Sequence, residues 1–277
     1  MGQRGSSVDD PFDERLAAFL GLRDHQGRQA RERPGGDMSG VFMAEGVTVI
    51  ERALSAGHHL QSVLVDRARP RDVLSMDLPA NVDLLLAGPE VLEAVSGRRQ
   101  LRDAIACFDR PQPVAVDDVL GRARTVAVLE GVVNPTNMGV IARCAAGLGC
   151  DALLVDPTSV DPLYRRCVRV SMGEVFAIPH ARLPPFPDGL DVLTRAGFST
   201  VALTPANDAI DIADYRRESD ERIAVLLGAE GAGLSDATMG RADCRVRIPM
   251  AAGVDSINVG AAAAIAFHMV AQVAGRT

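Results

Sequence analysis

The sequence of 277 residues contains no tryptophan and no lysine, and aromatic residues make up only 4% of it. So few aromatic side chains argue against an extended platform on which nucleic-acid bases stack. The strongly basic residues are all arginines, whose planar guanidinium suits bidentate contacts to phosphate. A formal net charge of −7 argues against nonspecific nucleic-acid binding by bulk charge, but it leaves room for a local basic patch.

The sequence also lacks the cysteine spacing of a metal site. Its five cysteines show no CxxC pair, which predicts reduced, mostly buried thiols and no bound metal. The N-terminal segment is polar, without the apolar core of a signal peptide. The apolar run 257–274 is rich in alanine and is interrupted by His268 and Gln272, which favours a buried helix over a membrane span. We therefore expect a cytoplasmic protein with no metal and no membrane partner.

Short apolar strands alternate with helical patterns along most of the chain, which predicts an α/β fold with a mainly parallel sheet. Residues 1–40 are predicted to form an extension, of which the Arg-, Gly- and Pro-rich stretch 26–40 is a loop or disordered. Residues 41–109 form a small α/β domain, and 110–124, with two prolines, form a linker. Residues 125–277 form a second α/β domain.

In the second domain, strands are predicted at 125–129, 152–155, 175–178, 199–203, 223–227 and 245–248. The last helix is predicted to begin at Ser256, with Asp255 or Ser256 capping its first N–H groups. Ligands of such a domain bind at the carboxyl ends of the strands. Three polar or glycine-rich stretches lie at these strand ends.

The first stretch runs from Asn134 to Arg143, directly after a strand. Asn134-Pro135 predicts a turn, and Asn137 is a candidate helix cap. Arg143 follows Gly139 by four residues and so lies on the same helix face, where Asn137 and Arg143 can share one pocket. Taken alone, the stretch fits equally well a capped helix with a surface arginine.

The second stretch is 226–234, in which a hydrophobic strand runs into a glycine-rich turn with one carboxylate, Glu230. The glycines allow backbone groups to approach a ligand closely. No Gly-Lys-Ser/Thr follows, and the spacing is not that of a dinucleotide GxGxxG motif. The alternative for Glu230 is an exposed loop acid.

The third stretch runs from Ile248 through a Pro/Gly loop to Ser256 and Asn258. These residues are placed at a helix N-terminus, where a polar, electron-rich group binds favourably. By itself, however, the stretch is more typical of a capped C-terminal core helix than of a binding site.

Together, in this order, the three stretches resemble the motifs of SpoU/TrmH-type RNA ribose 2′-O-methyltransferases of the SPOUT superfamily, over residues 125–270. Residues 161–173 resemble the connecting stretch of that family. Residues 43–46 and the helix after them resemble the start of its L30e-like RNA-binding domain. The resemblance implies a C-terminal domain with a deep trefoil knot, a smaller N-terminal L30e-like domain, and a homodimer formed through the knotted domain.

The resemblance also implies S-adenosyl-L-methionine as cofactor and RNA, either rRNA or tRNA, as substrate. Matching cofactor-binding positions are Leu203, Thr204, Gly228, Glu230, Ile248, Met250 and Ile257. Matching catalytic positions are Asn137, Arg143, Glu230, Ser256 and Asn258. Candidate RNA-binding arginines, each of which equally fits a solvated helix face, are Arg98, Arg99, Arg102, Arg165, Arg166 and Arg169.

The implied reaction is attack of a ribose 2′-oxygen on the sulfonium methyl group, with loss of the hydroxyl proton. The family's proposed activator matches Arg143, but a guanidinium is normally charged and cannot accept a proton. Arg143 therefore either acts as a base in an unusual setting, or stabilises the developing alkoxide or grips a neighbouring phosphate. Two other interpretations compete: a catalytically inactive L30e-like RNA-binding dimer, and an ordinary Rossmann enzyme, which the missing fingerprint disfavours.

Overall fold

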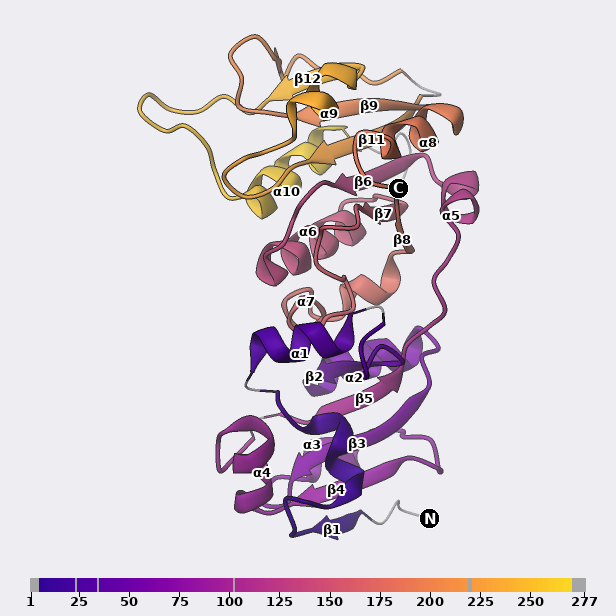
Figure 1. The fold of residues 1–277 in the computed structure, drawn as a ribbon, viewed down its shortest axis with the longest axis vertical. Helices are drawn as coiled ribbons and strands as arrows, with labels where there is room; N and C mark the ends of the chain where they lie inside the picture. The colour runs from indigo at the N-terminus through magenta and orange to yellow at the C-terminus, as the bar shows by residue number, and fades with distance from the viewer. Residues whose placement is uncertain (1–4, 23, 34, 102, 219–220, 271–277) are drawn as a thin grey trace. The chain divides into compact units, whose positions relative to one another are not determined.

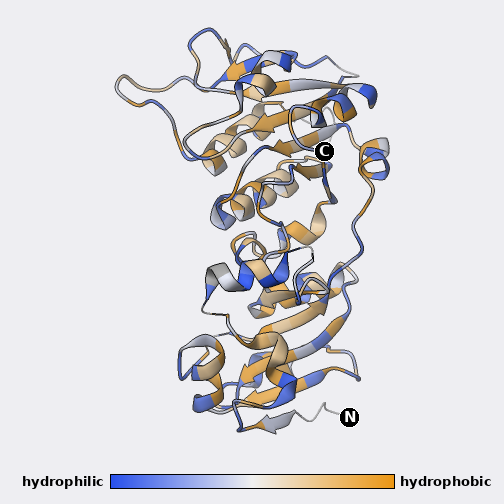
Figure 2. Ribbon diagram, in the orientation of Figure 1, coloured by the Kyte–Doolittle hydropathy of each residue, from blue (hydrophilic) through white to orange (hydrophobic). Residues whose placement is uncertain are grey.

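A computed structural model of the protein describes residues 5–22, 24–33, 35–101, 103–218 and 221–270. The chain divides into two compact units (Figure 1). Unit 1 comprises residues 1–112 together with Leu163–Gly173, and unit 2 comprises Pro113–Pro162 and Glu174–Thr277. Strands of both units are hydrophobic along much of their length (Figure 2), as expected for strands that build a core.

Unit 1 contains a five-stranded sheet in the order β1-β4-β3-β5-β2. β5 is antiparallel to β2 and β3, whereas β4 is parallel to β1 and β3. The strands are β1 (Ser6–Val8), β2 (Val41–Glu45), β3 (Leu60–Asp66), β4 (Asp83–Ala87) and β5 (Ile105–Asp109). The helices are the 3₁₀ helix η1 (Glu14–Phe19), α1 (His25–Glu32), α2 (Val47–Ser55), α3 (Arg71–Leu74) and α4 (Pro89–Ser96).

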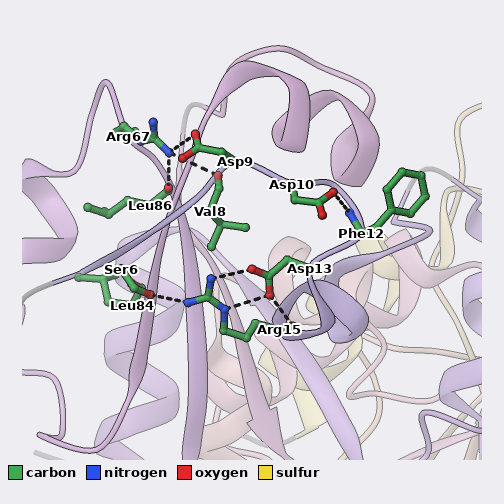
Figure 3. A network of polar contacts seen from close by, with 10 residues as sticks. All are labelled: Ser6, Val8, Asp9, Asp10, Phe12, Asp13, Arg15, Arg67, Leu84 and Leu86. Carbon is green, nitrogen blue, oxygen red and sulfur yellow. Dashed lines mark hydrogen bonds and ion pairs between the residues drawn. The ribbon is translucent and has the colours of Figure 1, made fainter.

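Within the described ranges, residues 5–22, 24–33 and 35–40 are part of unit 1, contrary to the prediction that residues 1–40 form an extension. Strand β1 pairs with the edge of β4, and the buried side chains of Leu16 and Phe19 join the sheet's core. Figure 3 shows the polar contacts of this segment: Arg67 donates to Asp9 at 2.6 Å, and Arg15 donates to Ser6 at 2.9 Å. The N-terminal segment is structured because its strand pairs with an exposed sheet edge and because two of its large apolar side chains are buried.

The polar stretch 26–40 was predicted to be a loop or disordered, but it begins within helix α1. Asp24 caps the helix by accepting from the Gly27 N–H at 2.9 Å. Arg28 is buried, forms an ion pair with Glu32 at 2.5 Å, and donates to the backbone carbonyls of Ala18 and Leu20. An arginine whose three nitrogen atoms each have an acceptor in this way can be buried, which composition alone does not reveal.

Unit 2 contains a seven-stranded sheet in the order β10-β12-β9-β11-β6-β7-β8, and every pairing in it is parallel. The mixed α/β fold with a parallel sheet is thereby confirmed. The strands are β6 (Thr125–Leu129), β7 (Ala152–Val155), β8 (His180–Arg182), β9 (Phe198–Leu203), β10 (Ile210–Asp211), β11 (Arg222–Leu227) and β12 (Cys244–Arg247). The helices are α5 (Val116–Arg122), α6 (Pro135–Gly147), η2 (Glu174–Ala177, 3₁₀), α8 (Gly189–Arg195), α9 (Asp236–Arg241) and α10 (Val259–Val270).

Helices α5 and α8 pack into one hydrophobic core with residues of β6, β7 and β11. Helices α6 and α10 pack against each other, away from α5 and α8 (Figure 1). No helix within the described ranges combines the length and the apolar character needed to cross a membrane.

Three boundaries differ from the predictions. The segment predicted as a strand at 175–178 is the 3₁₀ helix η2, and the strand follows at β8. The predicted linker 110–124 contains helix α5, because Val119 and Leu120 are needed in the core of unit 2. Helix α7 (Arg165–Val170), although it lies between β7 and β8 in sequence, belongs to unit 1. There Arg165 and Arg169 each form an ion pair with Glu45 of β2, at 2.9 Å.

Candidate functional site

A cavity of about 1080 Å³ lies where three neighbouring strands of unit 2 end. Its wall includes Leu203 and Thr204 at the end of β9, Gly228 after β11, and Ile248 after β12. The carboxyl ends of parallel strands meet at one edge of the sheet, so residues distant in sequence converge there. The size suits a drug-sized ligand or a nucleoside cofactor.

The glycine-rich loop after β11 forms part of this wall through its backbone. The loop folds back on itself, with hydrogen bonds from Ala229 N to Gly233 O at 3.1 Å and from Gly233 N to Ala229 O at 2.9 Å. A Cβ atom at Gly228 would overlap the backbone of Gly233 and Leu234. Gly231 has a φ of 89°, which disfavours residues with side chains. Glycine at Gly228 is thus required by the close approach of two backbone segments.

A chain of three polar side chains from different segments runs beside the cavity. Asn258 Nδ2 donates to Asn137 Oδ1 at 2.9 Å, and Asn137 Nδ2 donates to Glu230 Oε1 at 2.7 Å. Asn137 is 5% exposed, whereas Glu230 and Asn258 are exposed and line the cavity. The buried amide therefore has both ends matched and holds the two cavity residues in fixed positions.

The caps of the two helices that carry these asparagines differ from the predictions. Asn258 caps α10, since its Oδ1 accepts from Gly260 N at 2.9 Å and its backbone oxygen accepts from Ala262 N. The predicted capping residues Asp255 and Ser256 precede the helix and line the cavity instead. Likewise Asn134 caps α6 by accepting from Thr136 N at 2.8 Å.

Helices α6 and α10 must approach closely for Asn137 and Asn258 to meet. Gly260 is the contact point: a Cβ atom there would lie 2.7 Å from Cγ1 of Val140 and 3.1 Å from Oδ1 of Asn258. Absence of a side chain at this position therefore sets the helix separation and leaves the cap intact.

The loop that leads into α6 is held by Asp156, at the end of β7. Its carboxylate accepts from Gly131 N at 3.0 Å and from Ser159 N at 2.8 Å. Burial on its own would raise the pKa of Asp156, but hydrogen bonds from Ser159, Thr158 and Gly131 hold that pKa below its usual value. An ionised Asp156 thus fixes the start of the segment that carries Asn137.

Arg143 does not share a pocket with Asn137 within this chain. It lies six residues further along α6, which turns its side chain to another part of the helix surface. Its side chain is exposed and does not line the cavity, and it makes no hydrogen bond or ion pair with any residue that the structure describes. The predicted pocket shared by Asn137 and Arg143 is therefore not formed within this chain, because the six-residue step from Asn137, unlike the four-residue step from Gly139, turns Arg143 to another part of the helix.

Every residue singled out as a cofactor-binding position lines the cavity: Leu203, Thr204, Gly228, Glu230, Ile248, Met250 and Ile257. Two further lining residues that sequence reasoning missed are Arg245 and Arg247 on β12. The sequence could have indicated them, because they are two residues apart just before Ile248, and residues i and i+2 of a strand lie on the same face.

Residues 124–268, just over half of the chain, match the SpoU rRNA Methylase family. The chain belongs to this family. The SPOUT methyltransferase assignment made from the three motifs is thereby confirmed.

Relatives of this SpoU-family chain match it over most of its length. An uncharacterized tRNA/rRNA methyltransferase of Mycobacterium tuberculosis is 41% identical over 94% of this chain and 90% of its own. The 23S rRNA (guanosine(2553)-2′-O)-methyltransferase of Bacillus subtilis is 26% identical, over 83% of this chain and 88% of its own. The crystal structure of an AdoMet-bound rRNA methyltransferase from Sinorhizobium meliloti has the same fold. It has a TM-score of 0.77 and 23% identity, and covers 95% of this chain and 96% of the other.

The candidate RNA-binding arginines of this SpoU-family chain have unequal surroundings. Arg165 is 14% exposed and is held by Glu45 and by the Leu22 carbonyl, so its guanidinium is largely committed within unit 1. Arg169 shares Glu45 but is 61% exposed, and Arg99 pairs with Glu93 at 3.0 Å. Arg98 and Arg166 are exposed, and Arg102 lies outside the described residues.

Proposed function

We propose that this SpoU-family chain is an S-adenosyl-L-methionine-dependent RNA methyltransferase that methylates a ribose 2′-oxygen. The observation that carries the proposal is the cavity at the ends of β9, β11 and β12, bordered by Glu230 and Asn258 of the polar chain. The AdoMet-bound neighbour of the same fold supports the cofactor, and the Bacillus subtilis relative, named as a 2′-O-methyltransferase, supports the reaction.

The residues present fit this cofactor. Leu203, Ile248 and Ile257 offer apolar wall for an adenine ring, and the tight backbone at Gly228 leaves peptide groups for polar contacts. The cofactor supplies an electrophilic methyl group on a sulfonium ion. Glu230 and Asn258, held through Asn137, set the orientation of groups at the mouth of the cavity.

A ribose hydroxyl is a poor nucleophile, so the protein must stabilise the oxygen as its proton passes to water and the methyl group is transferred to it. Ser256, exposed beside the cavity, is placed to position the ribose. The guanidinium of Arg143 is proposed to stabilise the developing alkoxide or to bind an adjacent phosphate. Because Arg143 lies off the cavity of its own chain, we propose that it acts in the site of a second protomer of a homodimer.

Unit 1 is proposed to be the L30e-like RNA-binding part, and unit 2 the knotted part through which the homodimer forms. RNA is gripped through phosphates by exposed arginines such as Arg98 and Arg166. Replacing these two with glutamine should make RNA affinity less dependent on salt concentration. If the salt dependence of RNA affinity is unchanged in this variant, the two arginines do not bind phosphate and only form part of the solvated surface. The protein is proposed to work in the cytoplasm, on rRNA or tRNA.

The first experiment is calorimetric titration of the protein with S-adenosyl-L-methionine beside the variant Asn258→Ala. We expect binding by the wild type and a clear loss of affinity in the variant, because the cap of α10 and the contact to Asn137 both disappear. Total RNA incubated with labelled cofactor is then digested to nucleosides. Label in 2′-O-methylated nucleosides supports the proposal, and label only in methylated bases contradicts the ribose assignment.

The alternative of a catalytically inactive RNA-binding dimer finds no support in the comparisons. It would leave the wild type unable to bind the cofactor in this titration, and no label would enter RNA.

A further inference from the structure

Arg247 stands out among the charged residues of the cavity. Glu230, Asp236 and Asp255 contribute negative charge to the wall, and Arg245 and Arg247 contribute positive charge. Arg245 is paired with Asp208 at 2.9 Å. Within the described part of the chain, the Arg247 side chain has no hydrogen bond or ion pair, and its Nε atom is buried without an acceptor.

The strand explains why Arg247 is directed to the cavity. Its neighbour Val246 is fully buried in the sheet, so Arg245 and Arg247 lie together on the opposite face of β12. The Arg247 backbone oxygen accepts from Ile212 N at 2.9 Å, which anchors the residue between β10 and the cavity. A guanidinium stays charged in any protein environment, and buried donors are nearly always matched. The missing acceptor therefore points to an anionic group of a ligand.

We propose that Arg247 binds the carboxylate of S-adenosyl-L-methionine, an inference that rests on the proposed function. Arg247 directly precedes Ile248, which with Leu203 and Gly228 forms the wall assigned to the cofactor. Because Arg247 is half-buried in that wall, a small anionic group of a ligand that lies inside the cavity can reach its guanidinium. A phosphate in an RNA chain is better met by an exposed arginine such as Arg143. Arg247 is thus a specificity residue for the amino-acid end of the cofactor.

The test compares S-adenosyl-L-methionine with decarboxylated S-adenosylmethionine, which lacks only the carboxylate. Both are titrated against the wild type, Arg247→Gln and Arg247→Lys, with Arg245→Gln as the matched control from the same face of the same strand. We expect Arg247→Gln to weaken binding of the intact cofactor by about tenfold to hundredfold, with less than about a twofold effect on the decarboxylated compound. Arg247→Lys should recover part of the loss, because it keeps the charge but not the bidentate geometry.

The outcomes separate this inference from the function on which it rests. An equal loss for both compounds would show that Arg247 only supports the wall, and an unchanged affinity for both would also overturn the inference. A loss confined to RNA affinity, with a shallower salt dependence, would assign Arg247 to phosphate. Arg245→Gln should change neither affinity more than about threefold, and an effect equal to that of Arg247→Gln would mean that general wall charge is responsible. A wild type that binds neither compound would overturn the proposed function as well.

Discussion

Asn258 donates a hydrogen bond of 2.9 Å to Asn137 across 121 residues of sequence. Asn137 in turn donates a hydrogen bond to Glu230, so that one buried amide orients two residues of the cavity. The side-chain amide of Asn137 can do this because its oxygen accepts from Asn258 while its nitrogen donates to Glu230.

Replacing Asn137 with aspartate should be more damaging than its small change in shape suggests. The donor to Glu230 becomes a second carboxylate, and two like charges face each other in a largely buried position. We expect a loss of about 2 kcal/mol or more in the free energy of unfolding, with strongly reduced methylation. Denaturant unfolding beside Asn137→Ala is the measurement. Equal stability of the aspartate and wild-type proteins would mean that Asn137 does not hold Glu230.

Arg143→Lys and Arg143→Ala test the role of an exposed arginine that lies off its own cavity. We expect kcat to fall about 100-fold or more in both variants, because a transition-state contact is lost. Affinity for S-adenosyl-L-methionine should remain within about twofold of the wild type, since Arg143 does not line the cavity. Single-turnover rates and calorimetry give the two quantities. A near-normal rate with lysine would refute a role that needs the guanidinium.

Gly260→Ala should destabilise unit 2 through packing. The added methyl group would lie 2.7 Å from Cγ1 of Val140 and so pushes α6 and α10 apart. We expect a cost of about 1–3 kcal/mol, against the small gain that alanine normally brings to a helix. Gly240→Ala is the matched control, because its Cβ has open space around it. Thermal unfolding of both variants decides the matter, and equal melting temperatures would contradict a tight helix crossing.

Removing Glu45 should lower the free energy of unfolding more than removing its exposed partner Arg169. It is the shared partner of Arg165, which is 14% exposed, and of Arg169, which is 61% exposed. Glu45→Ala leaves the nearly buried Arg165 without its counter-charge and is expected to cost about 2–3 kcal/mol. Arg169→Ala removes only a solvent-screened pair and should cost less than about 1 kcal/mol. The reverse order in urea unfolding would show that α7 is held by apolar packing alone.

The buried thiols give the protein an alkaline limit. Burial raises the pKa of Cys107 and of Cys150 from 9.0 to about 12. Between these values the unfolded chain loses the thiol proton and the folded chain keeps it, so stability falls as pH rises above 9. We expect the alkaline fall to be shallower in Cys150→Ala, measured by unfolding from pH 8 upward relative to that variant's own stability at pH 8. A slope identical to that of the wild type would mean that the Cys150 thiol ionises while folded.

The sequence by itself determined the α/β class, the parallel strands of unit 2 and the three family motifs. These follow from local apolar periodicity and from residues whose spacing is set within one strand-loop-helix segment. Seven residues of the cavity wall, from Leu203 to Ile257, were also foreseen through the resemblance to that family, whereas Arg245 and Arg247 were not.

Only the tertiary structure decided which helix ends are capped by which asparagine, and that residues 5–32 build part of unit 1. It alone placed α7 beside Glu45, matched Arg28 with Glu32, and turned Arg143 away from Asn137. The physical reason is common to all of these. The local sequence leaves a polar residue several possible partners, and burial and matched hydrogen bonds choose among them. The partner lies four residues away for Arg28 and Glu32, and 121 residues away for Asn137 and Asn258.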